Sequence, residues 1–255
     1  MTSYEIFLQL HQQDQPLLVA NVWDISSARV VEQAGFPAMA TSSSAVAASL
    51  GYDDGERIPF ELMLQTVERI IRQINIPLSV DLERGYAADL AGILRHIEQL
   101  HDLGVAGINL EDSDGNQNRQ MQPMADFQKK LAGIAAFCQR KNLRIFINAR
   151  TDAYLLKLPG ALAETLRRAR AYEEAGASGL FVPFLDDPAG IRQISSSSRL
   201  PLHVIGTPRL PAFASLGQLG VKRISMGGAL YRAMNRSLMA MLRQIQEDQS
   251  LQSLF

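Results

Sequence analysis

The sequence contains a single cysteine, Cys138, in 255 residues. One cysteine cannot form an intramolecular disulfide, and it excludes a metal site built from several thiolates. Because structural disulfides are typical of oxidising compartments, this composition favours a reducing, cytoplasmic location. The segment 1–18 also lacks the positive start and the continuous apolar run of a signal peptide.

Long apolar runs and an excess of one charge are missing as well. No stretch approaches 18 uninterrupted apolar residues, so we expect no transmembrane helix. The formal net charge is −1, with neither a basic stripe nor an acidic tail, so nothing favours a nucleic-acid or membrane partner. With 47% hydrophobic and 20% charged residues, the composition is that of a globular protein with a substantial core.

Short apolar, β-branched runs alternate with longer amphipathic segments, which is the pattern of repeated βα units. Strands are predicted at Leu17–Asn21, Ala38–Ser42, Leu78–Asp81, Gly107–Leu110, Arg144–Ala149, Gly179–Pro183, Leu202–Ile205 and Arg223–Ser225. Helices are predicted at Ser26–Ala34, Phe60–Gln73, Ala87–Leu103, Pro123–Lys141, Ala161–Ala175, Ala189–Ser195, Leu210–Leu219 and Gly228–Asp248. Eight such units close into a barrel more simply than into an open sheet, and no dinucleotide-binding GxGxxG follows the first strand.

Neither a linker nor a low-complexity stretch marks a domain boundary. The four-serine run 195–198 is short enough to be a loop before the seventh strand. We therefore predict one (β/α)8 TIM barrel, of the α/β class, over residues 1–255.

Acidic side chains gather where the active sites of such barrels lie, after the carboxyl ends of the strands. Asp81 and Glu83 are two apart and share a face while the chain stays extended. Glu111 ends the fourth strand, and Asp54 lies in the loop after the second. Converging carboxylates repel one another, and hard oxygen ligands of this kind suit Mg²⁺ or Mn²⁺. The alternative for Asp81 and Glu83 is a helix N-cap followed by a first-turn acid.

A cationic group and a hydroxyl-rich loop join these acids. Arg150 ends the fifth strand, where a guanidinium fits a substrate carboxylate bidentately; a buried ion pair with a strand-end acid is the alternative. Hydroxyl and backbone N–H groups come from Ser42, Ser43 and Ser44. Trp23, the only tryptophan, either packs the barrel or lines the pocket. Together these groups indicate a metal ion that holds an anionic substrate.

The motifs that carry these residues resemble the isocitrate lyase and phosphoenolpyruvate mutase superfamily. They are NVWDISSARVVEQAGFPAMATSSSAVAASLGYDDGE, SVDLERGY, GINLEDS and INARTDAY, and the likeness runs from about Asn21 to Met234. It implies a (β/α)8 barrel whose last helix is exchanged between subunits of dimers, often within tetramers. It also implies that a C–C or P–C bond next to a 2-oxo acid is broken or made through an enolate held on Mg²⁺.

The resemblance assigns the acids one by one. Asp81 matches the metal-binding aspartate, and Glu83 stands at the second acid of the D-x-D/E pair. Glu111 and Asp54 match two further acids that bind the ion mainly through its waters.

The same resemblance assigns the substrate contacts. The segment that holds the carboxylate and carbonyl of a 2-oxo acid corresponds to Ser42, Ser43 and Ser44. Arg150 matches the arginine that contacts the substrate, and Arg150 and Glu111 are the predicted catalytic residues. Trp23 is the further candidate for substrate contact.

The loop after the fourth strand departs from the superfamily. Isocitrate and methylisocitrate lyases carry K-[KR]-C-G-H there, with the cysteine as general acid, whereas this chain has no Lys, Cys or His between Glu111 and Gln128. Cys138 falls in the following helix. Phosphonate enzymes use a loop lysine, which is missing, and a histidine near the sixth strand, where Pro183 stands.

The sequence thus predicts a Mg²⁺-dependent carbon–carbon lyase or decarboxylase for a small 2-oxo or 2-hydroxy di- or tricarboxylic acid. A phosphonate mutase or hydrolase is the second hypothesis, and a non-catalytic protein that binds a metal–oxo-acid complex is the third. The expected partners are the small carboxylic acid and further copies of the chain, as a dimer or tetramer with an exchanged helix.

Overall fold

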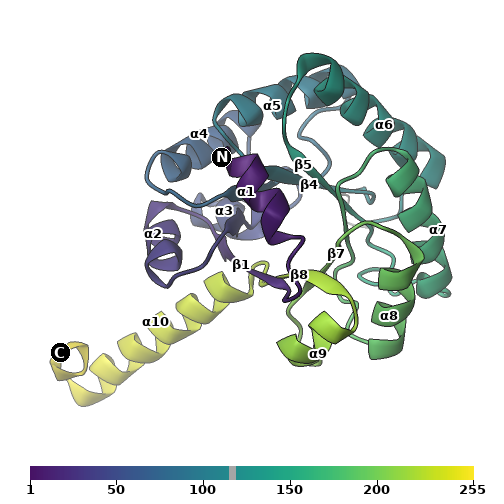
Figure 1. The fold of residues 1–255 in the computed structure, drawn as a ribbon. Coiled ribbons are helices and arrows are strands. Elements are labelled where there is room, and N and C mark those ends of the chain that lie inside the picture. Colours follow the sequence, from purple (N-terminus) through teal and green to yellow (C-terminus); the bar gives the residue numbers. More distant parts are fainter. Residues whose placement is uncertain (115–118) are drawn as a thin grey trace.

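A closed parallel barrel forms the centre of the computed structural model, which describes residues 1–114 and 119–255 (Figure 1). Its strands, within these residues, are β1 (Leu17–Val22), β2 (Met39–Thr41), β3 (Leu78–Asp81), β4 (Gly107–Glu111), β5 (Phe146–Arg150), β6 (Gly179–Phe181), β7 (Leu202–Ile205) and β8 (Val221–Ser225). Each strand pairs in parallel with the next along the chain, and β8 pairs with β1. This confirms the predicted (β/α)8 TIM barrel.

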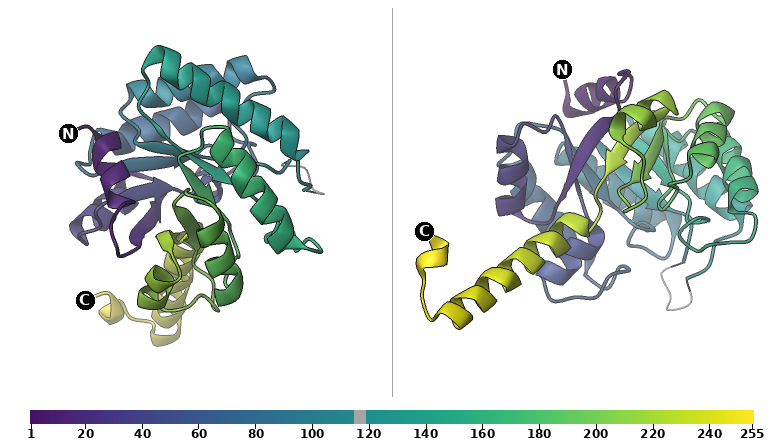
Figure 2. Two further views of the ribbon diagram at one scale, coloured as in Figure 1. Left: turned by 45° about the vertical axis from the view of Figure 1, so that its right-hand side comes forward. Right: turned by 90° about the horizontal axis from the view of Figure 1, so that it is seen from below.

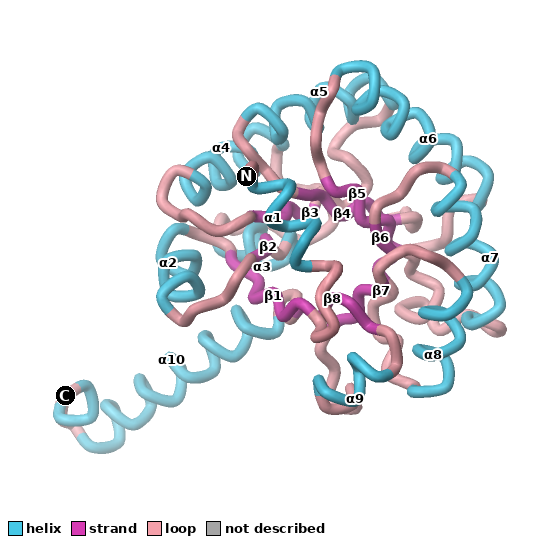
Figure 3. The backbone as a smooth tube through the Cα atoms, in the orientation of Figure 1, coloured by secondary structure: helices cyan, strands magenta, loops and turns pink. Residues whose placement is uncertain are grey.

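Helices form a ring around the strands (Figure 3). They are α2 (Ile25–Gln33), α4 (Phe60–Ile71), α5 (Leu90–Asp102), α6 (Met124–Lys141), α7 (Ala161–Glu174), α8 (Pro188–Ser197) and α9 (Phe213–Gln218). Apolar residues spaced three or four apart face the barrel, as Ile93, Ile97 and Leu100 do on α5. All these helices lie where the sequence predicted them, with ends that differ by a few residues.

Among the described residues, two α-helices were not predicted. One is α1 (Ser3–Leu10), which begins with a capping box between Thr2 and Glu5. The other is α3 (Ser43–Ser49), which begins directly after β2 and has Ser42 as its N-cap. Its small residues carry too little apolar periodicity to be recognised as a helix.

The amino-terminal end of the barrel is closed by α1. Phe7 on this helix is fully buried among inward side chains that include Val19, Ala40 and Phe146. His11 stacks on Phe146 with ring centroids 4.4 Å apart. The second view in Figure 2 shows α1 at one end of the barrel and the loops that follow the strands at the other. Only that other end is therefore open to a substrate.

The last long helix, α10 (Ala229–Asp248), leaves the barrel and projects outward, followed by the short helix η1 (Gln252–Leu254) (Figures 1 and 2). None of the residues of α10 is buried. Its exposed apolar side chains are Met234, Leu238, Met239, Met241 and Leu242. In the part of the chain that the structure describes, no helix is long and apolar enough to span a membrane.

Candidate active site

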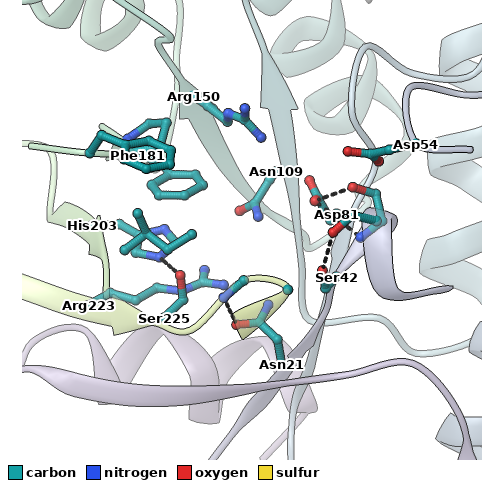
Figure 4. Close-up of a pocket in the computed structure, with 17 residues that line it drawn as sticks. Asn21, Ser42, Asp54, Asp81, Asn109, Arg150, Phe181, His203, Arg223 and Ser225 are labelled. Carbon is teal, nitrogen blue, oxygen red and sulfur yellow. Dashed lines mark hydrogen bonds between the residues drawn. The ribbon is translucent and has the colours of Figure 1, made fainter. Parts of the chain in front are cut away.

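A small cavity opens at the carboxyl ends of the strands, where TIM-barrel active sites lie (Figure 4). Its volume is about 110 Å³, well below the roughly 300–1,000 Å³ of sites for drug-sized ligands, so it suits a small molecule. Its lining comprises Asn21, Ser42, Ser43, Ser44, Asp54, Asp81, Asn109, Arg150, Phe181, Pro183, Phe184, His203, Ile205, Arg223, Ser225, Gly227 and Gly228.

Asp81 presents a free carboxylate oxygen at this cavity. Its Oδ2 accepts a hydrogen bond from the hydroxyl of Ser43 at 2.9 Å, and its backbone N–H donates to Oγ1 of Thr41 at 2.9 Å. Its Oδ1 is buried and has no hydrogen-bond partner among the described residues. Asp54 lines the same cavity, and its pKa is raised by burial and, secondly, by the charge of Asp81. Two acids at one cavity, one of which has an unsatisfied carboxylate oxygen, form a site that attracts a cation.

Glu83 lies beside this pair without lining the cavity. β3 ends at Asp81, and Glu83 has a φ of 48°, so the extended chain assumed from the sequence was wrong here. Oε1 of Glu83 accepts hydrogen bonds from the hydroxyl of Tyr86 at 2.8 Å and the backbone N–H of Glu56 at 3.1 Å. Burial, and then the charge of Asp81, raises the pKa of Glu83 to about 8.

Arg150 is held between two acids at the ends of β4 and β5. Its Nη1 lies 2.9 Å from Oε2 of Glu111, and its Nε donates to Oδ1 of Asp152 at 2.6 Å. Arg119 adds a second cation, 3.4 Å from Glu111 and 3.3 Å from Asp152. Burial raises the pKa of Glu111 to about 7, against the opposing effect of Arg150. Arg150 therefore makes the buried ion pair and also lines the cavity.

A buried network behind Arg150 was missed at the sequence level. Asp112 accepts hydrogen bonds from the hydroxyl of Tyr172 at 2.5 Å and from Arg168 on α7 at 3.0 Å. The other oxygen of Asp112 accepts from the backbone N–H of Asp152 at 3.0 Å. This network ties the β4 and β5 loops to α7 and so fixes the carboxylate that orients Arg150.

The three serines differ in their contacts. Ser42 caps α3, accepting from the backbone N–H of Ala45 at 3.4 Å, and its hydroxyl lies 3.1 Å from that of Ser44. Ser43 is committed to Asp81, as described above. The predicted hydroxyl-rich loop is thus the start of a helix, and all three serines face the cavity.

Trp23 does not line this cavity. Its ring packs edge-on against Tyr231 of α10, with centroids 5.0 Å apart. This is the packing role that the sequence left open, and a substrate contact for Trp23 stays a prediction.

The acids fit Mg²⁺ only if most of them contact the ion through its bound waters. Among residues 1–114 and 119–255, no three His, Cys, Asp or Glu side chains are close enough together to share one ion. Mg²⁺ usually keeps several waters and takes one or two carboxylates directly. The unpartnered Oδ1 of Asp81 is suited to direct ligation, and Asp54, which lines the same cavity, is suited to the water shell of the ion. Glu83 and Glu111 are not among the residues that line the cavity.

Several lining residues were not assigned a role from the sequence. Asn21 fixes the loop after β8, since its Oδ1 accepts from the backbone N–H groups of Met226 at 2.9 Å and Gly227 at 2.8 Å. Arg223 and Ser225 face the interior from β8 (Figure 4). The sequence feature that could have indicated them is that Arg223 and Ser225 are two apart, which puts two polar side chains on the same face of a strand.

With this geometry in view, the likeness to known proteins becomes informative. The model of the phosphoenolpyruvate phosphomutase family matches residues 7–246. An uncharacterized protein of Mycobacterium tuberculosis (strain CDC 1551 / Oshkosh) is 34% identical over 227 residues, 89% of this chain and 83% of that protein. An oxaloacetate decarboxylase of Ectopseudomonas mendocina (strain ymp) is 29% identical over 231 residues, 88% of this chain and 78% of that enzyme.

Solved structures agree in fold. A protein of Burkholderia cenocepacia J2315, provisionally described as a phosphonomutase, superposes with a TM-score of 0.89 at 40% identity, covering 94% of this chain and 99% of that chain. A phosphonopyruvate hydrolase in complex with oxalate and Mg²⁺ superposes with a TM-score of 0.87 at 23% identity, which is a likeness of fold. It covers 99% of this chain and 90% of that one. The chain therefore belongs to the phosphoenolpyruvate phosphomutase family, within the isocitrate lyase and phosphoenolpyruvate mutase superfamily of enzymes.

Proposed function

We propose that this protein is a Mg²⁺-dependent carbon–carbon lyase that cleaves a small 2-oxo or 2-hydroxy di- or tricarboxylic acid through an enolate. One observation carries the proposal: an aspartate with a free oxygen and an arginine face the same cavity of about 110 Å³. The similarity to an oxaloacetate decarboxylase supports the cleavage of a C–C bond. The Mg²⁺–oxalate complex of a fold relative supports the use of Mg²⁺.

The side chains divide the work between charge and orientation. Asp81 would hold Mg²⁺ through Oδ1, while the hydroxyl of Ser43 fixes its other oxygen. Bound there, Mg²⁺ would supply Lewis-acid stabilisation for the charge that develops on the carbonyl oxygen. Arg150 would bind the substrate carboxylate, with its orientation set by Asp152 and Glu111. Holding the substrate between these groups aligns the bond that breaks.

The proposal is tested by the thermal stability of the protein with 2-oxo acids, tricarboxylates and phosphonates, each with and without Mg²⁺. A ligand that binds only the native state raises the melting temperature by mass action. We expect oxaloacetate, pyruvate or 2-oxoglutarate to stabilise the protein only when Mg²⁺ is present, and the ligand that binds to be turned over.

Other outcomes would point elsewhere. Stabilisation by phosphonopyruvate alone, with inorganic phosphate released, would replace the C–C lyase by a phosphonate hydrolase. Binding of 2-oxo acids without turnover would identify a non-catalytic binding protein. If no ligand changes the melting temperature in a Mg²⁺-dependent way, the proposal is wrong.

We also propose that α10 packs against a second copy of the chain. A helix of 20 residues spans about 30 Å, and its apolar side chains at positions 234, 238, 241 and 242 form a stripe that nothing covers within the described residues. Exchange of this helix in a dimer or tetramer would bury the stripe. Light scattering after gel filtration tests this: Leu238→Asp should yield a smaller species than Arg243→Asp, and identical masses would contradict it.

A further inference from the structure

The floor of the cavity holds a cation that the site described above does not use. Arg223 on β8 lines the cavity, with its side chain beside that of Ser225 (Figure 4). Its exposed fraction is 1%. From the described side chains and backbone, none of its three guanidinium nitrogens receives a hydrogen-bond partner. The ring of Phe7 lies 5.3 Å from Cζ and covers the side that faces the closed end of the barrel.

A guanidinium in this position is costly unless something pairs with it. It has five N–H donors and no acceptor, and burying it without partners costs several kcal/mol. Burial lowers the pKa of Arg223 to about 9, against the opposing charge of Asp81, so the group is still charged at pH 7. Since Phe7 offers only a ring face, the missing partners must come from the cavity side.

The neighbours of Arg223 leave a second hydrogen-bond donor, the hydroxyl of Ser225, at the floor of the cavity. His203 faces Arg223 in the β7–β8 register. Nδ2 of Asn148 can only donate, so Nδ1 of His203, 3.0 Å away, accepts. Burial, and then the charge of Arg223, holds the pKa of His203 well below its usual value, so the ring is neutral and its proton sits on Nε2. That proton is donated to Oγ of Ser225 at 2.7 Å, which leaves the serine O–H free to donate elsewhere.

Two arginines therefore face the cavity, and they differ in whether an acidic side chain already pairs with them. Arg150 is already paired with Glu111 and Asp152. Arg223 is unpaired within the described residues and has a hydroxyl donor beside it. A substrate with one carboxylate would satisfy the groups near Asp81 and Arg150 and leave Arg223 without a counter-ion.

We infer that Arg223, together with Ser225, binds the second carboxylate of the substrate, which makes the substrate a 2-oxo dicarboxylate. The inference rests on the proposed function, because it takes the 2-oxo end of the ligand to lie at Asp81. A planar carboxylate accepts two parallel N–H bonds from a guanidinium. One arginine also matches the single charge of a carboxylate better than the larger charge of a phosphonate. Arg223 is thus a specificity-determining residue that selects substrates with a second, terminal carboxylate.

The test compares ligands that differ only in that charge. In the presence of Mg²⁺, dissociation constants are measured by calorimetry for oxalate, for oxaloacetate against 2-oxobutyrate, and for 2-oxoglutarate against 2-oxovalerate. Each pair exchanges a carboxylate for a methyl group. We expect the parent protein to bind the better-fitting dicarboxylate at least about 30-fold more tightly than its methyl counterpart, as for a buried charge pair.

Substitutions then locate the preference. Arg223→Met should remove it by weakening only the dicarboxylates, with oxalate unchanged, while Ser225→Ala should reduce it partially. Lys222→Met removes the same charge from the adjacent position on β8, which contacts the backbone oxygen of Gln13, and should change nothing. Circular dichroism and the melting temperature establish that each variant is folded.

The outcomes separate the two proposals. If oxalate does not bind the parent protein with Mg²⁺, the proposed function fails. If oxalate binds and the parent shows no preference for dicarboxylates, or if Arg223→Met weakens all ligands equally, the inference about Arg223 is wrong. Should Arg223→Met not fold, the preference of the parent for dicarboxylates and its partial reduction in Ser225→Ala decide. Tighter binding of phosphonopyruvate than of either dicarboxylate would also overturn it.

Discussion

The two ends of the barrel are built from the same strands and have opposite characters. At the amino-terminal end, inward side chains such as Val19 and Phe146 pack around Phe7 of α1. Two residues further along the same strands, the inward side chains are Asn21 and Asn148, and beyond them the cavity begins. One end is apolar and sealed, whereas the other is polar and open.

The difference shows that one closed sheet can place the residues that stabilise the fold at one end and the residues that bind a ligand at the other. Apolar burial at the sealed end contributes to folding whatever the open end carries. The open end can then retain unpaired groups, among them Oδ1 of Asp81 and the guanidinium of Arg223, each without a partner in the described part of the chain. Such groups cost stability and are kept where a ligand uses them. Substitutions at the two ends should therefore change different measurements.

The largest expected effect is at the open end, from Asp81→Ala. Removal of the buried carboxylate oxygen of Asp81, which lines the cavity and has no hydrogen-bond partner among the described residues, should abolish Mg²⁺-dependent ligand binding and turnover. The fold should persist, because Asp81 makes no apolar contact in the sealed end. Calorimetric titration with Mg²⁺ and oxalate measures the effect. Asp102→Ala, at an exposed acid on α5, is the control; parental affinity in Asp81→Ala would show that the metal site lies elsewhere.

The matching change at the sealed end is Phe7→Ala. Phe7 is fully buried, so its removal leaves a cavity and should lower the free energy of unfolding by about 3–5 kcal/mol. The affinity for oxalate with Mg²⁺, which does not depend on Arg223, should stay close to that of the parent when it is measured well below the melting temperature. Urea denaturation gives the stability, and Phe213→Ala on exposed α9 serves as control. A large loss of affinity with little loss of stability would contradict the separation of the two ends.

An intermediate effect is expected from Asp152→Asn, which keeps the shape and removes a charge. Asp152 accepts from Nε of Arg150 at 2.6 Å and from the hydroxyl of Ser113 at 2.5 Å. A loosened Arg150 should raise the KM for the 2-oxo acid by about 10-fold, roughly 1.4 kcal/mol, with a smaller change in kcat. Steady-state kinetics tests this against Asp186→Asn, an acid in the loop after β6 that binds Arg209. An unchanged KM would mean that Glu111 alone orients Arg150.

The sequence predicted the barrel because every strand was a short apolar run followed by an amphipathic helix. Asp81 and Arg150 were found for a related reason: each is a polar residue at the end of an apolar run, where barrel active sites lie. Asp54 was found in the loop after the second strand and through the resemblance to the superfamily. Their presence along one cavity agrees with that expectation, although their individual roles are still predictions.

Other features needed the three-dimensional structure. The bend that turns Glu83 away depends on a φ of 48°, which a non-glycine residue adopts rarely and no local pattern announces. Arg223 was missed because a predicted strand of three residues is too short to show which side chains face inward. The closure by α1 arises from contacts between Phe7 and residues more than 130 positions away, such as Phe146.

The smallest predicted effect concerns the response of the sealed end to acid. His11 donates from Nδ1 to the backbone oxygen of Phe7 at 2.7 Å, and burial, followed by the charge of Arg223, lowers its pKa to about 3. In the unfolded chain the pKa is near 6.5, so below that pH the unfolded state binds a proton that the folded state does not. Stability from His11 is therefore complete above pH 6.5 and is lost as the pH falls toward 3, by at most about 1.4 kcal/mol per pH unit.

His11→Phe keeps an aromatic ring against Phe146 and removes the titration. Urea denaturation at about pH 7.5, 6.5, 5.5 and 4.5 gives the free energy of unfolding of both proteins across the pKa shift. We expect the two values to diverge only below about pH 6.5, where that of the parent falls more steeply. His203, whose pKa is held well below its usual value mainly by burial, is present in both proteins and contributes a loss of stability with acid to each. His101→Gln, at a partly exposed histidine on α5, is the matched control. Parallel curves for His11→Phe would mean that the sealed end admits a proton, and water with it, so that the two ends are less distinct than their side chains indicate.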